Sequence, residues 1–76
     1  MAELLAHLAR QLVDEPDAVK VEEVQREGAT VLQLRVAKAD VGKVIGRQGR
    51  TARALRTIVR ASGARSNERA LLEIVG

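Results

Sequence analysis

At the start of the chain, apolar residues recur at every third or fourth position, which is the spacing of an amphipathic helix. Polar side chains such as Glu3 and Arg10 fall on the opposite side. The helix should end near Asp14, because Pro16 disfavours helical geometry in the residue before it. The inward side of this helix is predicted to carry Met1, Leu4, Leu5, Leu8 and Leu12.

Alternation of apolar and polar residues beyond Pro16 predicts a first β-strand. Val19 and Val21 keep the two-residue period of a strand, but Val24 falls out of phase. One extra residue would restore the phase, so a bulge is expected around Glu22-Glu23. The segment therefore resembles an edge strand.

A second strand is predicted from Thr30 to Ala37, after a turn at residues 27–29 that contains Gly28. Its inward face would carry Leu32, Leu34 and Val36. Because the connection is so short, the two strands should pair antiparallel as a hairpin.

Helical spacing returns after the hairpin. Asp40 is of a residue type favoured at the N-cap, and it precedes a short helix that should end at Gly46. A longer helix is predicted from Gly49 to Ser62, with Gly63 ending it and Ala52, Leu55, Ile58, Val59 and Ser62 facing inward. Alternation at residues 70–75 then predicts a last strand.

The predicted order of elements is αββααβ. Two helices between the second and third strands provide a crossover, so these strands can lie parallel and adjacent with right-handed crossing. We therefore expect an α+β fold in which helices cover one face of a three-stranded mixed sheet. A chain of 76 residues is long enough for one such domain, spanning residues 1–76.

Charge is divided unevenly along the chain. The first 40 residues hold 5 Lys or Arg against 8 Asp or Glu, whereas the remaining residues hold 8 against 2. A basic second half suggests a polyanionic partner such as nucleic acid, although a solvated basic helix face explains it equally well. The complete absence of Phe, Trp and Tyr removes the stacking platforms used by RRM and cold-shock domains.

The composition argues against an enzyme. With no Cys and one His, the chain lacks the means for disulfides, thiol catalysis or the usual zinc sites, and no cofactor is expected. His7 has no nucleophile or second ligand near it in the sequence, and Glu22 and Glu23 point to opposite faces of a strand. No apolar run approaches the roughly 20 residues that span a bilayer, so a cytoplasmic location is expected.

The loop between the two central helices carries the strongest functional signal. Gly46 and Gly49 allow positive φ angles and let a ligand approach the backbone closely. Gly49 leads into a helix, whose free N–H groups and positive dipole end favour phosphate oxygens. Arg47 adds a mobile positive charge. A lone G-x-x-G is weak evidence by itself, because helical turns often use two glycines structurally.

Val44-Ile45-Gly46-Arg47-Gln48-Gly49 resembles the signature of KH domains, and its place in a β-αα-β unit after a helix and strand resembles the type II, bacterial arrangement. Lys43 to Arg60 is similar to the small single-KH-domain bacterial RNA-binding proteins of the KhpA type. Ala52 departs from the larger aliphatic residue that many KH domains have there. The RNA-binding residues that the resemblance implies are Lys43, Val44, Ile45, Gly46, Arg47, Gln48, Gly49, Arg50 and Arg53.

On the family's plan, single-stranded RNA lies between the loop and the sheet, in a groove floored by Val41, Val44, Ile45 and strand residues. The resemblance also implies an RNA chaperone or post-transcriptional regulator that forms a homodimer or pairs with a larger KH-containing protein. We expect the interface on the long helix, where a strip of mostly small side chains would let a helix of the partner approach closely. The strip consists of Ala54, Thr57, Ile58 and Ala61.

Two other functions remain open from the residues. A KH fold can serve as a protein-interaction scaffold, although acidic or bulky loop residues would then be expected. Single-stranded DNA is the other alternative, since nothing in the sequence identifies a group that reads the 2′-OH. Among the arginines of the long helix, Arg50 is best placed for RNA, whereas Arg53, Arg56 and Arg60 fit solvated residues or general phosphate attraction as well.

Overall fold

The computed structural model describes residues 1–76 and has the predicted order of a helix, two strands, two helices and a strand. Short 3-10 turns, which periodicity did not predict, precede β1, precede α2 and form the loop between α2 and α3. The elements are α1 (Ala2–Leu12), β1 (Lys20–Arg26), β2 (Ala29–Arg35), α2 (Val41–Ile45), α3 (Arg50–Arg65) and β3 (Ala70–Val75).

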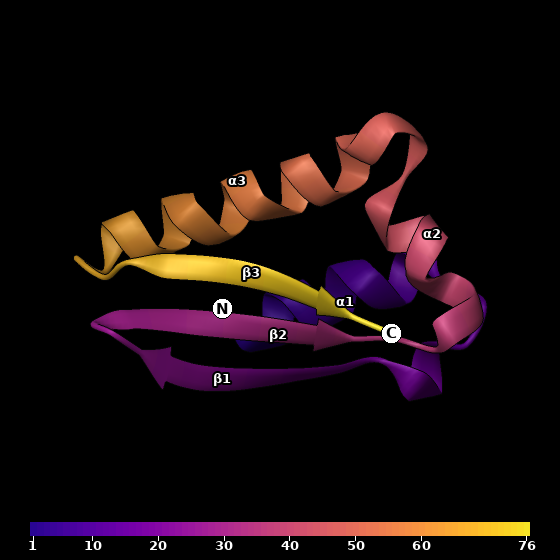
Figure 1. The fold of residues 1–76 in the computed structure, drawn as a ribbon, viewed down its shortest axis with the longest axis horizontal. Helices are drawn as coiled ribbons and strands as arrows, with labels where there is room; N and C mark the ends of the chain where they lie inside the picture. Colours follow the sequence, from indigo (N-terminus) through magenta and orange to yellow (C-terminus); the bar gives the residue numbers. More distant parts are fainter.

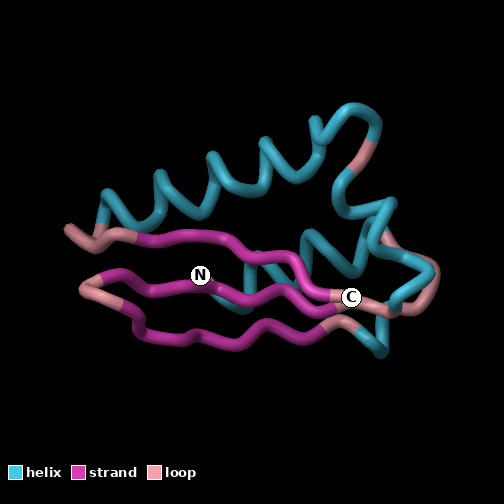
Figure 2. The backbone as a smooth tube through the Cα atoms, viewed as in Figure 1, coloured by secondary structure: helices cyan, strands magenta, loops and turns pink.

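The three strands form one mixed sheet in the order β1-β2-β3, with β1 antiparallel and β3 parallel to β2. The helices pack on one face of this sheet, with α1 behind it and α3 alongside β3 in the view of Figure 1. Figure 2 shows the hairpin turn and the α3–β3 turn together at one end of the molecule, and α2 with its loops at the other. The predicted mixed sheet and parallel crossover are therefore confirmed.

The core lies between the helix-covered face of the sheet and the three helices. β2 contributes Leu32 and Leu34, which are fully buried together with Leu5 of α1, Val44 of α2 and Val59 of α3. Each such side chain stabilises the fold by about 1.5–3 kcal/mol relative to an exposed one. The central strand β2 and all three helices therefore share one hydrophobic cluster.

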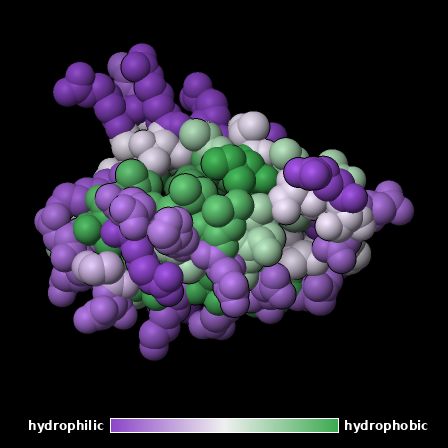
Figure 3. Space-filling view, turned by 180° about the vertical axis from the view of Figure 1, so that it is seen from behind, coloured by the Kyte–Doolittle hydropathy of each residue, from purple (hydrophilic) through white to green (hydrophobic).

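α1 packs on the sheet through only part of the predicted side: Leu5 and the partly buried Leu8 contact the core, whereas Met1, Leu4 and Leu12 are exposed. Leu5, Ala6 and Ala9 are buried, whereas Leu4 is 48% exposed and Leu12 is 39% exposed. The small alanine side chains let the helix approach the sheet closely, and this rotates the outer leucines toward solvent. Figure 3 shows a hydrophobic area on the face of the molecule that α1 covers.

β1 is a regular edge strand, so the predicted bulge at Glu22-Glu23 is wrong. Its residues pair with β2 in unbroken register from Lys20 to Arg26. Val21 pairs with Leu34 on the helix-covered face and Val24 pairs with Val31 on the other face. Val21 and Val24 are out of phase because their side chains lie on opposite faces of the sheet.

The helix α3 continues to Arg65, past Gly63, which was predicted to end it. Gly63 is buried inside the helix, where an added Cβ would lie 2.7 Å from the Ala70 Cβ. After Arg65 the chain turns out of the helix through Asn67, which has a φ of 56°, and the Glu68 N–H donates to the Gly63 carbonyl over 2.7 Å. Glycine is thus required for the close approach of β3. Ile58, also predicted to face inward, is 37% exposed.

Candidate nucleic-acid interface

The loop between α2 and α3 is built on residues with positive φ angles. Gly46 has a φ of 77°, and an added Cβ would lie 2.3 Å from the Thr51 Oγ1, so only glycine fits this position. Gln48 and Gly49 follow in left-handed conformation, with φ of 56° and 74°. These three residues turn the chain sharply from the end of α2 to the start of α3.

The loop presents its backbone and two side chains to solvent. Arg47 and Gln48 are exposed, and an added Cβ at Gly49 would meet no atom within 4 Å. The start of α3 has no side-chain cap and no acidic residue in its first turn, so its free N–H groups carry uncompensated positive character. The Arg50 Nη2 donates to the Gln48 Oε1 over 3.2 Å, which links the loop to the helix.

Asp40 positions α2 by a contact that the sequence did not predict. It precedes α2 but makes no side-chain cap; its carboxylate accepts a hydrogen bond from the Glu15 N–H over 3.0 Å. Burial would raise the pKa of Asp40, but hydrogen bonds from the Glu15 and Asp14 N–H groups and the charge of Lys43 outweigh it and hold the pKa below its ordinary value. The buried carboxylate therefore ties α2 to the segment after α1.

Lys43 belongs to the same ionic cluster. Its Nζ donates to the carboxylate of Asp14 and lies 3.5 Å from the Asp40 Oδ1. The hydrogen bond to Asp14 raises the pKa of Lys43, and the charges of both carboxylates act in the same direction against partial burial. Lys43, a predicted RNA contact, therefore has its charge compensated within the protein.

The apolar residues before the loop divide into two groups. Val44 is fully buried, so it supports the loop from within the core rather than lining a surface groove as predicted. Ile45 is 37% exposed and Val41 is half-buried, so both can contribute an apolar surface beside the loop. Ala52, at the start of α3, is buried.

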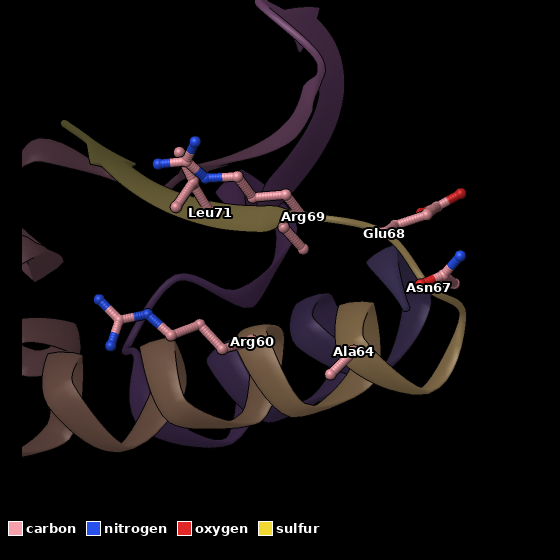
Figure 4. A pocket seen from close by; sticks show the side chains of 7 residues that line it. Arg60, Ala64, Asn67, Glu68, Arg69 and Leu71 are labelled. Carbon is pink, nitrogen blue, oxygen red and sulfur yellow. The ribbon is translucent and has the colours of Figure 1, made fainter.

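The arginines of α3 extend the basic surface away from the loop. Arg50 and Arg53 are exposed near the loop, and Arg56 and Arg60 line hollows between α3 and β3. Sequence reasoning left Arg56 and Arg60 out of the site because helical spacing alone does not reveal which side of α3 adjoins the strand. Arg69, directly before β3, was missed altogether, and Figure 4 shows it across from Arg60.

Neither a metal centre nor a membrane span emerges from the structure. No group of three or more His, Cys, Asp or Glu side chains lies close enough to hold a metal ion. No helix combines the length and apolarity needed to cross a membrane.

Comparison with known proteins agrees with this geometry. The family described as KhpA/KhpB, KH domain, matches residues 2–74. The chain is 48% identical over 75 residues to RNA-binding protein KhpA of Clostridium acetobutylicum, covering 99% of this chain and 100% of that protein. It is 56% identical over 73 residues to RNA-binding protein KhpA of Treponema pallidum, covering 96% of this chain and 91% of that protein.

A solved structure supports the same architecture. Era from Aquifex aeolicus, crystallised with GDP and aluminium fluoride, matches 96% of this chain with a TM-score of 0.59 and 18% identity. The match spans 28% of the Era chain. At this identity the likeness concerns the fold alone.

Proposed function

Since the chain belongs to the KhpA/KhpB family of KH domains, we propose that it is a non-enzymatic RNA-binding protein that holds short single-stranded RNA at Gly46–Gly49. The main support for the proposal is the geometry of this loop. Left-handed residues turn the backbone outward beside the uncapped start of α3, where N–H groups and two arginine side chains can meet phosphates. The relatives named above are described as RNA-binding proteins.

The role of each residue follows from its position. Arg47 and Arg50 would neutralise phosphates, Gln48 would donate through its amide, and Gly49 would let the strand approach the backbone. Ile45 would contact a base edge or sugar from the α2 side. Lys43 would act indirectly, because its ion pairs with Asp14 and Asp40 hold α2 and therefore the loop in place.

The proposal can be tested by comparing how single-stranded and double-stranded RNA bind. Single-stranded RNA should bind better than a duplex of the same sequence, since a KH groove reads unstacked base edges. With three or four phosphates neutralised, the logarithm of affinity should fall against the logarithm of salt concentration with a slope of about −2 to −3. Fluorescence anisotropy with matched oligonucleotides measures both quantities, and a preference for the duplex would refute the proposed function.

In the cell, the protein would act in the cytoplasm as an RNA chaperone or post-transcriptional regulator. A domain without a catalytic cluster acts on RNA by holding it, and holding single strands changes which base pairs form. Crosslinking in cells followed by RNA sequencing would identify the bound transcripts, and recovery of the same transcripts without the intact loop would contradict this role.

Self-association is the second part of the proposal. Ala54, Thr57, Ile58 and Ala61 are all exposed on the outer side of α3, and the Thr57 hydroxyl donates to the Arg53 carbonyl within the helix. The strip therefore offers small and apolar surface without an unsatisfied polar group. It would pair with the same strip of a second copy, or with a larger KH-containing protein.

A further inference from the structure

Strand β1 leaves one edge of the sheet open. It is the outer strand in the order β1-β2-β3, whereas α3 lies alongside β3 at the opposite edge (Figure 1). None of the backbone hydrogen bonds outside the helices and strands involves residues 20–26, so the outward N–H and C=O groups of β1 have no partner in the chain. Such an edge can pair with a strand of another molecule.

The backbone of β1 is well suited to such pairing. The strand is seven residues long, contains no Pro and pairs with β2 without a bulge, although Pro and bulges are common means of blocking an edge. Its protection therefore rests on charged side chains, and like charges directly opposite each other destabilise a strand pair. The charges of β1 consequently decide which strand can pair with it, and in which register.

The sequence of β1 is complementary to itself in one antiparallel register. Glu22, Val24 and Arg26 lie on the face of the sheet that the helices leave open, because they alternate with Val21 on the covered face. When Val24 lies opposite Val24 of a second copy, Glu22 of each strand lies opposite Arg26 of the other. Two pairs of opposite charge then flank an apolar pair.

The covered face and the other registers favour the same arrangement. On the covered face, Glu23 of one copy lies opposite Gln25 of the other, whose amide can donate to the carboxylate. A shift of two or four residues keeps the faces aligned, but it places Glu23 opposite Glu23 or Glu22 opposite Glu22. Among these registers, only the one centred on Val24 avoids like charges directly opposite each other.

Arg26 can bind a second carboxylate in addition to its partner within the chain. Its Nη1 lies 3.1 Å from the Oε2 of Glu73, which also accepts a hydrogen bond from the Gln33 amide. These contacts hold the Arg26 side chain over the open face, and a guanidinium has five N–H donors, so donors remain for another carboxylate. Glu22, by contrast, is exposed and has no ion pair within the chain.

The helix above β1 leaves space beside the open edge. A hollow of about 540 Å³ lies between α1 and β1, lined by Ala2, Glu3, Ala6, His7, Arg10 and Val21. The side chains that a second copy places on the covered face of the sheet can therefore be accommodated next to the strand.

We infer that β1 is an interaction surface for β1 of a second copy, with the two strands antiparallel and Val24 at the twofold axis, so that both sheets join into one. This interface is separate from the strip on α3 and from the loop at Gly46–Gly49, which lie away from the β1 edge. The inference therefore does not rest on the proposed function.

The first test is disulfide trapping. The chain has no Cys, so Val24→Cys places a single thiol at the twofold axis. Directly opposite residues of an antiparallel pair have Cα atoms about 4.5–5.5 Å apart, which a disulfide can bridge. Under mild oxidation this variant should form a covalent dimer, whereas Lys20→Cys, exposed on the same face but outside the paired residues, should not.

Two outcomes of the trapping experiment would overturn the inference. One is equal crosslinking of Val24→Cys and Lys20→Cys, which would reflect random collision. The other is loss of the Val24→Cys crosslink when Ala61→Glu is added, because the copies would then be brought together through α3.

The second test exchanges charges in the Ala61→Glu background, which removes any contribution of the α3 strip. Glu22→Arg alone and Arg26→Glu alone each place like charges opposite one another, so each should weaken self-association by about tenfold. An equimolar mixture of the two variants restores both pairs of opposite charge and should associate as strongly as the Ala61→Glu protein. Sedimentation equilibrium measures the association constants, and a mixture that associates no better than its components would overturn the inference.

Discussion

Arg47 and Gln48 are exposed between the two loop glycines, so their replacement changes the surface that is proposed to meet RNA and little else. We expect Arg47→Asp combined with Gln48→Asp to abolish RNA binding, because two negative charges would face phosphate. Aspartate tolerates the left-handed backbone of residue 48, so the free energy of unfolding should change by no more than about 0.5 kcal/mol. Anisotropy titration and thermal melting measure the two effects.

The neutral double variant Arg47→Asn with Gln48→Asn is the control for this experiment, since it shortens both side chains without adding negative charge. It should keep part of the affinity. A folded aspartate variant that binds RNA as tightly as the original protein would show that the loop is not the clamp.

Asp40 makes stability depend on pH in the acid range. Its carboxyl is buried, yet its pKa lies below the ordinary value of 3.8 because two backbone N–H groups and Lys43 stabilise the charged form. The unfolded chain therefore takes up this proton first, so the carboxylate stabilises the fold above about pH 4 and the contribution is lost as pH falls through the folded-state pKa. Asp40→Asn should be less stable at pH 7 and should lose less free energy of unfolding between about pH 4 and pH 2.

Urea unfolding at a series of pH values measures this difference. Asp17→Asn, at an exposed residue without an ion pair, serves as the control and should follow the original protein. If the Asp40→Asn curve ran parallel to that of the original protein, the ionic cluster would not be a source of stability.

At the scale of elements, hydrophobic periodicity predicted the type and order of every helix and strand, because each has one face against the core. Periodicity could not predict how those faces sit on one another. α1 packs through Ala6 and Ala9 rather than through Leu4, and the two strand valines Val21 and Val24 serve opposite faces of the sheet. Such choices depend on the shape of the opposite surface, which is absent from a local pattern.

Contacts between distant segments were missed for the same reason. Asp40 accepts a hydrogen bond from Glu15, 25 residues away, and so differs from the local cap that its position suggested. The loop glycines were found because their function is local: the backbone conformation itself requires glycine. The position of Arg56 and Arg60 beside β3 could only be found once β3 was placed next to α3.

Gly63 tests the packing of α3 on β3. Alanine is the better helix former by about 1 kcal/mol. In the folded protein, however, its Cβ would lie 2.7 Å from the Ala70 Cβ and 2.9 Å from the Glu68 carbonyl oxygen. Overpacking of this kind costs about 1–3 kcal/mol, so Gly63→Ala should be destabilised by a net amount of about 1 kcal/mol.

Gly42 provides the matched comparison for Gly63. It also lies in a helix, but an added Cβ would meet no atom within 4 Å, so Gly42→Ala should raise the free energy of unfolding by up to about 1 kcal/mol. If β3 packs on Gly63, urea unfolding should show a lower free energy of unfolding for Gly63→Ala and a higher one for Gly42→Ala. Stabilisation by both substitutions would contradict the packing.

At the scale of the whole molecule, the core is small for the chain that it supports. Of 76 residues, 16 are buried, and no disulfide reinforces them. Domains of this size bury only about 60% of the surface that the unfolded chain exposes, so burial of further apolar surface in an interface adds appreciably to stability. The outer strip of α3 is suited to this because its side chains are short and Ile58 is 37% exposed.

Ala61→Glu should therefore shift the protein from dimer to monomer, because it places a charge in the middle of the strip where the second helix would pack. Ala39→Glu makes the same change at an exposed residue of the turn before α2 and should leave the association constant unchanged. Sedimentation equilibrium over a range of concentrations measures the association constant of all three proteins. A monomer at every concentration, unaffected by Ala61→Glu, would remove the proposed interface, whereas equal weakening by both substitutions would assign the effect to charge alone.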